Sequence, residues 1–261
     1  MNESVGNVIV VQPYFPTGVK RIITTGSNHY IGYVNETTIL KYPHEPTPSH
    51  GLDVECALFE QLGKHHRFIE FKDRHEAGLL LELAPNGSLE SYMKETVLTK
   101  QERIRLAKEI AEGVAHAHEK SVIICDIHVR NILLDSNLHV KLCDFQGRLL
   151  GPEGQVLRDG GASENAESFM PREDEDLADQ KTDMFALGST IYHIMEGHRP
   201  FPELHPIDNE SEFRRRYREG RFPALAADVG GNIVRKCWEG KYESANQVFQ
   251  DLTALEAQFQ R

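Results

Sequence analysis

The stretch from Ile123 to Gly147 limits the possible folds and functions of this chain more than any other part. It reads I-I-C-D-I-H-V-R-N-I-L-L-D-S-N-L-H-V-K-L-C-D-F-Q-G, with polar residues set between apolar runs. Asp126 and Asn131 lie five residues apart within it. Polar side chains held between buried segments are expected on a turn, where binding and catalytic residues concentrate.

A hairpin is predicted directly after Asn131. Ile132–Leu134 and Val140–Leu142 have strand composition, and Asp135-Ser136-Asn137 supplies turn residues between them. The second strand returns the chain to Asp144, so this carboxylate is expected beside the first two polar side chains. Three oxygen-bearing side chains would then converge.

This stretch resembles the catalytic loop and the metal-binding loop of the eukaryotic protein-kinase superfamily, written H-R-D-L-x-x-x-N and D-F-G. The residues that match its aspartate, asparagine, aspartate and phenylalanine are Asp126, Asn131, Asp144 and Phe145. The resemblance is to a divergent member, because Ile124 and Cys125 replace the motif's His and Arg, and Gln146 replaces its glycine.

The resemblance implies roles for these residues in phosphoryl transfer from ATP. Asp126 would orient a substrate hydroxyl and accept its proton. Asn131 and Asp144 would hold Mg²⁺, which prefers oxygen ligands and keeps several waters. Each residue alone also fits a plainer role, since Asp and Asn on turns commonly cap backbone groups.

Three antiparallel strands are predicted in the N-terminal part, around Ile22-Ile23, Ile31–Val34 and Thr37–Leu40. The first turn, Gly26-Ser27-Asn28, stands where the family has its glycine-rich G-x-G-x-x-G loop, of which only Gly26 and Gly32 remain. The backbone amides of Gly26, Ser27 and Asn28 would form a small phosphate-binding nest, although a plain hairpin turn would have the same sequence.

Lys41 ends the third strand and resembles the lysine that reaches the α- and β-phosphates of ATP. A helix is predicted over Leu52–Leu62 from its apolar spacing. On this helix Glu55 is the candidate partner of Lys41, and Glu60 is the rival. Such an ion pair would orient the lysine toward phosphate.

Two further strands, Phe68–Phe71 and Leu79–Leu83, are expected to complete a five-stranded sheet. The second runs into E-L-A-P-N-G-S-L, which resembles the hinge between kinase lobes. The resemblance implies that the backbone at Glu82 and Ala84 binds the adenine of ATP.

Helical patterns dominate the remainder of the chain. Thr99 and Glu102 form a predicted capping box before a long amphipathic helix. Asp183 matches the family's D-x-W-x-x-G helix start and is expected to brace the catalytic loop. Residues 148–175 carry many glycines and acidic residues with little periodicity, which predicts an exposed activation-type segment.

Composition excludes several classes of protein. The 261 residues carry a net charge of −11, which argues against nucleic acid or an anionic membrane as the main partner. No signal peptide and no apolar run of membrane-spanning length is found, so no membrane insertion is expected. The four cysteines lack metal-ligand spacing and are typical of reduced thiols in an intracellular protein, either cytoplasmic or nuclear: Cys56, Cys125, Cys143 and Cys237.

The predicted fold is therefore α+β and two-lobed, like a protein kinase. An N-terminal lead-in covers residues 1–18 and the kinase-like domain 19–261. The domain would comprise an N-lobe of about 19–83 with a five-stranded antiparallel sheet and one helix, a hinge of about 82–88, and a mainly helical C-lobe of about 88–261.

The leading hypothesis for function is an ATP- and Mg²⁺-dependent kinase that phosphorylates a protein substrate, by default on serine or threonine. The alternative is a nucleotide-binding or inactive pseudokinase scaffold, which the thin glycine loop and the replacements at Ile124 and Gln146 favour. Five polar positions argue against a scaffold, which has no need for all of them: Lys41, Glu55, Asp126, Asn131 and Asp144.

Overall fold

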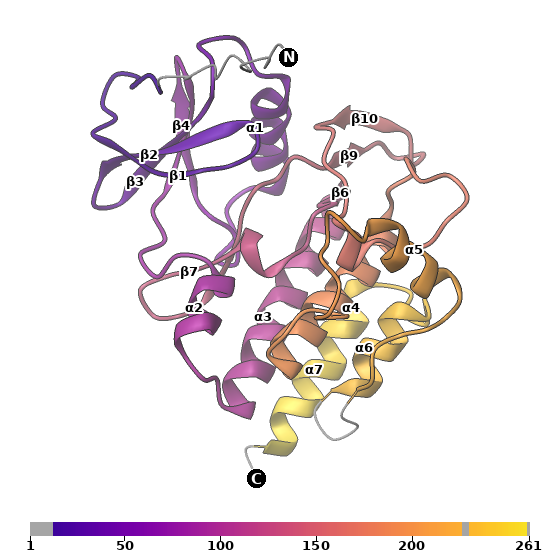
Figure 1. Cartoon of the computed structure of the whole chain (residues 1–261). Coiled ribbons are helices and arrows are strands. Elements are labelled where there is room, and N and C mark those ends of the chain that lie inside the picture. Colours follow the sequence, from indigo (N-terminus) through magenta and orange to yellow (C-terminus); the bar gives the residue numbers. More distant parts are fainter. Residues whose placement is uncertain (1–12, 226–229, 260–261) are drawn as a thin grey trace, which may run out of the picture. The chain divides into compact units, whose positions relative to one another are not determined.

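A computed structural model describes residues 13–225 and 230–259 of the chain (Figure 1). These residues divide into two compact units. The first holds the described residues up to Ser49 together with Lys72–Leu83, and the second holds His50–Phe71 together with those from Ala84 onwards. Most of the predicted lead-in lies outside the described residues, and the predicted lobe boundaries stay predictions.

The first unit is built on a five-stranded antiparallel sheet with the order β1-β2-β3-β5-β4. Its strands are β1 (Arg21–Thr25), β2 (His29–Asn35), β3 (Thr38–Pro43), β4 (Phe71–His75) and β5 (Gly78–Glu82). The central strand β3 is buried from Thr38 to Tyr42 because it has a neighbour on both sides. Its register places Lys41 opposite Ile31 on β2 and Leu79 on β5.

Two glycines let this sheet pack closely. A Cβ atom at Gly78 would lie 2.0 Å from the carbonyl oxygen of Lys41, so β5 requires glycine at its start. A Cβ atom at Gly32 would lie 2.7 Å from Val19 and 3.0 Å from Tyr42. Gly32 therefore has a packing reason to be glycine, independent of any nucleotide. The buried side chains around this region are Tyr30, Leu40 and Tyr42.

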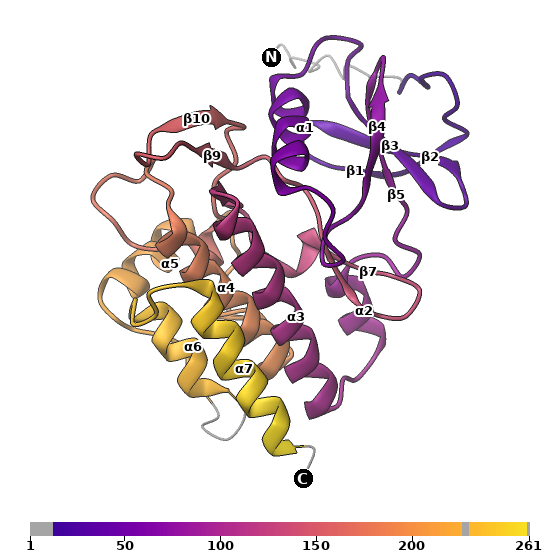
Figure 2. The ribbon, with the colours of Figure 1, turned by 180° about the vertical axis from the view of Figure 1, so that it is seen from behind.

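The second unit is mainly helical. Its helices are α1 (His50–Leu62), α2 (Leu89–Glu95), α3 (Lys100–Glu119), α4 (Gln180–Glu196), α5 (Glu210–Arg218), α6 (Gly231–Trp238) and α7 (Ala245–Phe259). Within it α3 packs against α4 and α7, and α4 packs against α6, as both views show (Figures 1 and 2). The sheet of the first unit and the helices of the second confirm the predicted α+β fold.

Short strands and turns connect these helices: β6 (Val122–Ile123), β7 (Ile132–Leu134), β8 (Val140–Leu142), β9 (Arg148–Leu150), β10 (Val156–Asp159), and the 3-10 turns η1 (Val129–Asn131) and η2 (Ala166–Ser168). The predicted hairpin is confirmed, because β7 pairs with β8 and Ile132 lies opposite Leu142. Strands β10, β9 and β6 form a second small sheet.

The helix starts follow the capping signals with one correction. Thr99 and Glu102 form the predicted capping box at the start of α3. The long helix α4, however, begins at Gln180 and is capped by Asp179. The predicted start at Asp183 is wrong, because the carboxylate of Asp179 already accepts the exposed backbone N–H groups of the first turn.

Two other expectations are corrected. The apolar run Phe68–Phe71 is not a strand, since β4 begins at Phe71. Phe68 and Ile69 are each 2% exposed, and the Ile69 N–H donates to the carbonyl of Leu142 at 2.9 Å, so these two residues belong to the core, whereas Glu70 is exposed.

The segment 148–175 is not uniformly exposed. It contains the β9–β10 hairpin and η2, where Glu164, Glu167 and Phe169 are buried. The partner of Glu167 is His128, outside the segment, and the partner of Glu164 is Arg172, eight residues further on, so no local pattern marks these acidic residues as buried. Among the described residues, no helix has the length and apolar character needed to cross a membrane.

Candidate active site

Asp126 and Asn131 are joined directly within the second unit. The Asn131 side-chain nitrogen donates to Asp126 Oδ2 at 2.8 Å and to the Asp126 carbonyl at 3.1 Å. The chain reaches Asp126 from the buried strand β6 and leaves Asn131 into β7, as expected for a turn between buried elements. The other carboxylate oxygen of Asp126, Oδ1, is buried and accepts no hydrogen bond from the described residues.

Asp144 follows β8 and is placed by its neighbour. The ring of Phe145 is fully buried and lies edge-on to Phe59 at 5.2 Å and to Phe68 at 5.1 Å between ring centroids. Asp144 itself has a φ of 64°, a left-handed conformation that aspartate tolerates better than most residues. Gln146 Nε2 donates to Asp144 Oδ1 at 3.1 Å.

The electrostatics suit a proton acceptor at Asp126. Burial raises the pKa of Asp126, and the nearby carboxylate of Asp144 adds to the rise, against the hydrogen bond from Asn131. A carboxylate with a raised pKa is a stronger base than an exposed one. The backbone N–H of Cys143, next to Asp144, donates to the Asn131 carbonyl at 3.1 Å, so Asp144 follows directly on the turn that carries Asp126 and Asn131, as the sequence predicts.

The donor set fits a hard divalent cation. Because Asn131 uses its amide nitrogen to hold Asp126, its oxygen Oδ1 is the atom turned to other partners. Asp144 supplies a carboxylate from the adjoining loop. One amide oxygen and one carboxylate are ligands that Mg²⁺ accepts, with water completing its shell.

The remaining predicted site residues are divided between the two units. Lys41 is 6% exposed on β3, whereas Glu55 is fully buried on α1 of the second unit. The rival Glu60 is exposed. Glu82 ends β5 in the first unit and Ala84 begins the second, so the roles given to these residues stay predictions.

The turn at Gly26–Asn28 is an exposed hairpin turn. Its Gly26 N–H donates to the His29 carbonyl at 2.8 Å, as in an ordinary turn. A phosphate nest there would consequently rest on the amides of Ser27 and Asn28.

Asp183 braces the catalytic loop, as predicted. It is completely buried on α4, and its carboxylate accepts the backbone N–H of Ile124 at 2.8 Å and of Cys125 at 2.9 Å. His118 Nε2 lies 2.9 Å from the same carboxylate. These bonds fix the backbone immediately before Asp126, where Cys125 has a φ of 69°.

Two buried contacts in the segment after β10 are not predicted from the sequence. Arg172 binds Glu164 through its two terminal guanidinium nitrogens, at 3.1 and 3.0 Å. Glu167 contacts His128 of the catalytic loop. No local pattern in the sequence identifies either pair of partners.

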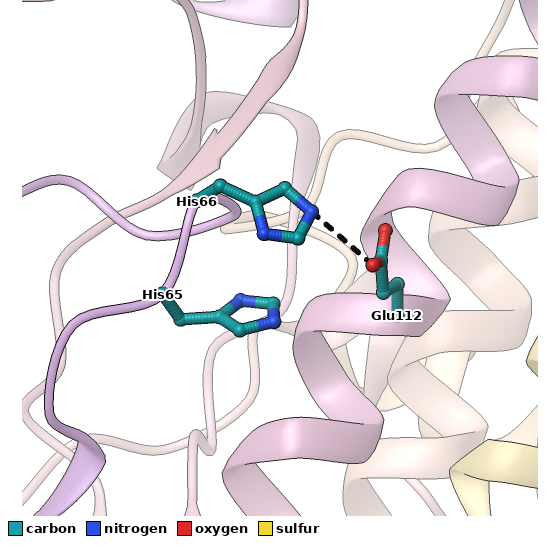
Figure 3. A group of neighbouring side chains, drawn as sticks. All are labelled: His65, His66 and Glu112. Carbon is teal, nitrogen blue, oxygen red and sulfur yellow. Dashed lines mark ion pairs between the residues drawn. The ribbon is translucent and has the colours of Figure 1, made fainter.

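A second group of ligand-capable side chains comes from the segment after α1 and from α3 (Figure 3). Nitrogens of His65 and His66 and an oxygen of Glu112 lie within 4.8 Å of one another. Burial, then the neighbouring His116, lowers the pKa of His65 to about 4, so its ring is neutral near pH 7.

These atoms already have partners that a metal would have to displace. His66 Nε2 lies 3.2 Å from Glu112 Oε1, and Arg67 Nε donates to Glu112 Oε2 at 2.7 Å. The Arg67 backbone N–H donates to His65 Nδ1 at 3.3 Å, which leaves the proton of the neutral ring on Nε2. We interpret these contacts as structural: they hold the segment after α1 against α3.

Comparison with known proteins identifies the family. The family model described as protein tyrosine and serine/threonine kinase matches residues 39–254. Similar curated proteins include the leucine-rich repeat serine/threonine-protein kinase 1 of Mus musculus, 29% identical over 65% of this chain and 9% of that protein. The Fer-related kinase 1 of Caenorhabditis elegans is 27% identical over 63% of this chain and 43% of its own length.

A third relative, the dual specificity protein kinase shkC of Dictyostelium discoideum, is 24% identical over 68% of this chain and 37% of its own length. The chain thus spans less than half the length of these relatives. The family model nevertheless covers most of the chain, including the joined Asp126 and Asn131 and the Asp144 loop. This chain therefore belongs to the protein tyrosine and serine/threonine kinase family.

Proposed function

We propose that this chain is an ATP- and Mg²⁺-dependent protein kinase that transfers the γ-phosphate to a serine or threonine hydroxyl of a protein substrate. The observation that carries the proposal is the convergence of Asp126, Asn131 and Asp144 on one site of the second unit. Two relatives whose names include serine/threonine-protein kinase support the choice of hydroxyl.

Asp126 would act as the base of the reaction. Its buried oxygen Oδ1 is the atom that would accept the hydrogen bond and then the proton of the substrate hydroxyl. Asn131 fixes the other oxygen, so the carboxylate would meet the hydroxyl in one orientation.

Asn131 Oδ1 and the carboxylate of Asp144 would hold Mg²⁺. The ion, when bound, neutralises charge on the phosphates. Lys41, oriented by Glu55, would contact the phosphates. As the family resemblance implies, backbone groups would bind the nucleotide further: the turn that begins at Gly26, through the amides of Ser27 and Asn28, for phosphate, and Glu82 and Ala84 for adenine.

The second candidate is a scaffold that binds nucleotide without transferring phosphate. It is favoured by Gln146, whose Nε2 donates to Oδ1 of Asp144 at 3.1 Å. This bond uses an oxygen of the proposed metal ligand. The use of the Gly26 N–H inside its own turn also favours it.

One pair of measurements separates the two candidates. Nucleotide that binds only the folded protein raises its melting temperature by mass action. For the kinase, we expect a nucleotide-induced shift that requires Mg²⁺, together with transfer of radiolabelled phosphate to a generic protein substrate. A shift that persists unchanged in chelator, with no transfer, would support the scaffold.

Replacing Asp144 with Asn is expected to raise the Mg²⁺ concentration needed for half-maximal nucleotide binding at least about tenfold, or about 1.4 kcal/mol. The amide keeps the shape of the side chain but removes the ligand that carries charge. Titrating Mg²⁺ at fixed nucleotide, with melting temperature as the readout, gives this value. The exposed Asp176, changed to Asn, is the matched control. An unchanged Mg²⁺ requirement in Asp144→Asn would remove Asp144 from the metal site.

Phosphorylation of residues 144–171 is not expected to control activity. The segment has two hydroxyl residues, of which Ser163 is exposed and Ser168 is 1% exposed. A phosphate on Ser163 would sit next to the acidic Glu164, and Cys125 stands where the family resemblance places a phosphate-binding arginine. Phosphatase treatment and Ser163→Ala should leave the transfer rate nearly unchanged. A loss of about tenfold, or 1.4 kcal/mol in transition-state stabilisation, would contradict this.

A further inference from the structure

A buried contact joins the catalytic loop to the segment after β10. Nε2 of His128 lies against Oε1 of Glu167, and the two side chains are 6% and 4% exposed. His128 stands between Asp126 and Asn131, whereas Glu167 lies in η2. Two parts of the chain that are 39 residues apart thus share a hydrogen bond shielded from water.

The direction of this bond follows from its surroundings. The Arg130 backbone N–H donates to Nδ1 of His128 at 3.2 Å. A backbone N–H is only a donor, so Nδ1 is unprotonated and Nε2 carries the ring proton. His128 therefore donates to Glu167, and this contact fixes its tautomer.

The imidazole also organises the turn that carries Asn131. His128 is the N-cap of η1, whose last residue is Asn131. The Asn131 N–H donates to the His128 carbonyl at 2.8 Å, and the Asn131 side chain holds Asp126. Displacing the His128 ring would thus loosen the proposed metal ligand and the proposed base together.

Glu167 is itself anchored on its other side. Its N–H donates to Asn165 Oδ1 at 3.1 Å, and its carbonyl accepts the hydroxyl of the buried Tyr217 at 2.7 Å. Burial alone would raise the pKa of Glu167, but the hydrogen bond from His128 and the positive charge around it, chiefly at His128 and Arg130, together lower this pKa. The side chain therefore remains a carboxylate near neutral pH.

We propose that Glu167 is a positioning residue, which accepts the Nε2–H bond of His128 and thereby holds η1, with Asn131, in its metal-binding geometry. The carboxylate of Glu167 would thus link the segment after β10 to the catalytic loop without phosphorylation. The metal-binding part of this inference rests on the proposed function, whereas the coupling of Glu167 to η1 does not.

Two variants of Glu167 and one control test the proposal. Glu167→Ala deletes the acceptor, and Glu167→Gln keeps an oxygen that accepts the same bond. Glu164→Ala is the matched control, because it breaks a buried ion pair of the same segment whose partner Arg172 lies outside the catalytic loop. If Glu167→Ala fails to fold, Glu167→Asp keeps the charge but shortens the side chain by one methylene group.

Amide hydrogen exchange of residues 128–134 is the first readout, and it does not depend on activity. Glu167→Ala should speed exchange at Asn131 at least about tenfold, and should raise the Mg²⁺ requirement for nucleotide binding by a similar factor. Glu167→Gln and Glu164→Ala should stay close to wild type in both measurements.

The outcomes separate the two claims. Unchanged exchange in Glu167→Ala, or an equal increase in Glu164→Ala, would overturn the inference whatever the activity. Glu167→Gln behaving like Glu167→Ala would also overturn it, because a retained acceptor should suffice. If Glu167→Ala speeds exchange as expected but the wild-type protein transfers no phosphate, the coupling of Glu167 to η1 stands and the proposed function is rejected.

Discussion

Replacing Asp126 with Asn is expected to lower the rate of phosphoryl transfer by about 10²–10⁴-fold, the usual contribution of a positioned acid or base. The amide cannot accept the hydroxyl proton, yet it keeps the shape of the carboxylate and an oxygen for the bond from Asn131. Affinity for nucleotide with Mg²⁺ should remain within a few-fold of wild type, because Asp126 would contact the hydroxyl rather than the nucleotide. Single-turnover transfer and a thermal-shift titration measure the two quantities separately.

The matched control is Asp208→Asn, the same change at a carboxylate that is 77% exposed. It should leave transfer and binding unchanged. Burial and the carboxylate of Asp144 raise the pKa of Asp126. Because the base must be deprotonated, wild-type activity should be lost as the pH is lowered, at a pH higher than the usual pKa of an aspartate. Transfer by Asp126→Asn at the wild-type rate would reject the proposed kinase mechanism.

The parts of the site that the sequence predicts are those built from neighbouring residues. Asp126, Asn131 and Asp144 are tied together by one turn and one hairpin, and the β7–β8 register is local enough to follow from composition. Four strands of the five-stranded sheet also follow, because they alternate with clear turn residues, whereas the remaining strand lies at Phe71–His75 and not at Phe68–Phe71. Local patterns fix elements and the short-range geometry between them.

The contacts that the sequence does not predict join residues far apart. Glu167 stands in E-N-A-E-S, which has the composition of a solvated loop, yet its partner His128 lies 39 residues away. Glu164 is also buried, against Arg172 eight residues further on, and no helix or strand shared by the two residues brings them together. An acidic residue is buried only where the tertiary structure brings a hydrogen-bonding or charged partner to it, and the local hydrophobic periodicity of the sequence does not reveal that partner. The strand predicted at Phe68–Phe71 is wrong for a different reason, because apolar core segments and short strands have the same composition.

Asp183→Asn is expected to reduce the free energy of unfolding by at least about 1–3 kcal/mol, the cost of leaving a buried donor without its acceptor. The carboxylate accepts two backbone N–H groups and the His118 ring. An amide offers one oxygen in place of two, and its NH₂ group would face a donor. At least one buried donor would then lose its partner, at a cost of about 1–3 kcal/mol by itself. Chemical denaturation at neutral pH measures the change.

The neighbouring Asp179→Asn is the matched control, because asparagine is about as good an N-cap as aspartate. It should change stability by less than about 1 kcal/mol. Asp183→Asn should also release Cys125 from its left-handed conformation, so any folded fraction should transfer phosphate more slowly even at saturating nucleotide. If the two variants were equally stable and equally active, the hydrogen bonds of Asp183 would be replaceable. The catalytic loop would then be held by the packing of β6 and the β7–β8 hairpin alone.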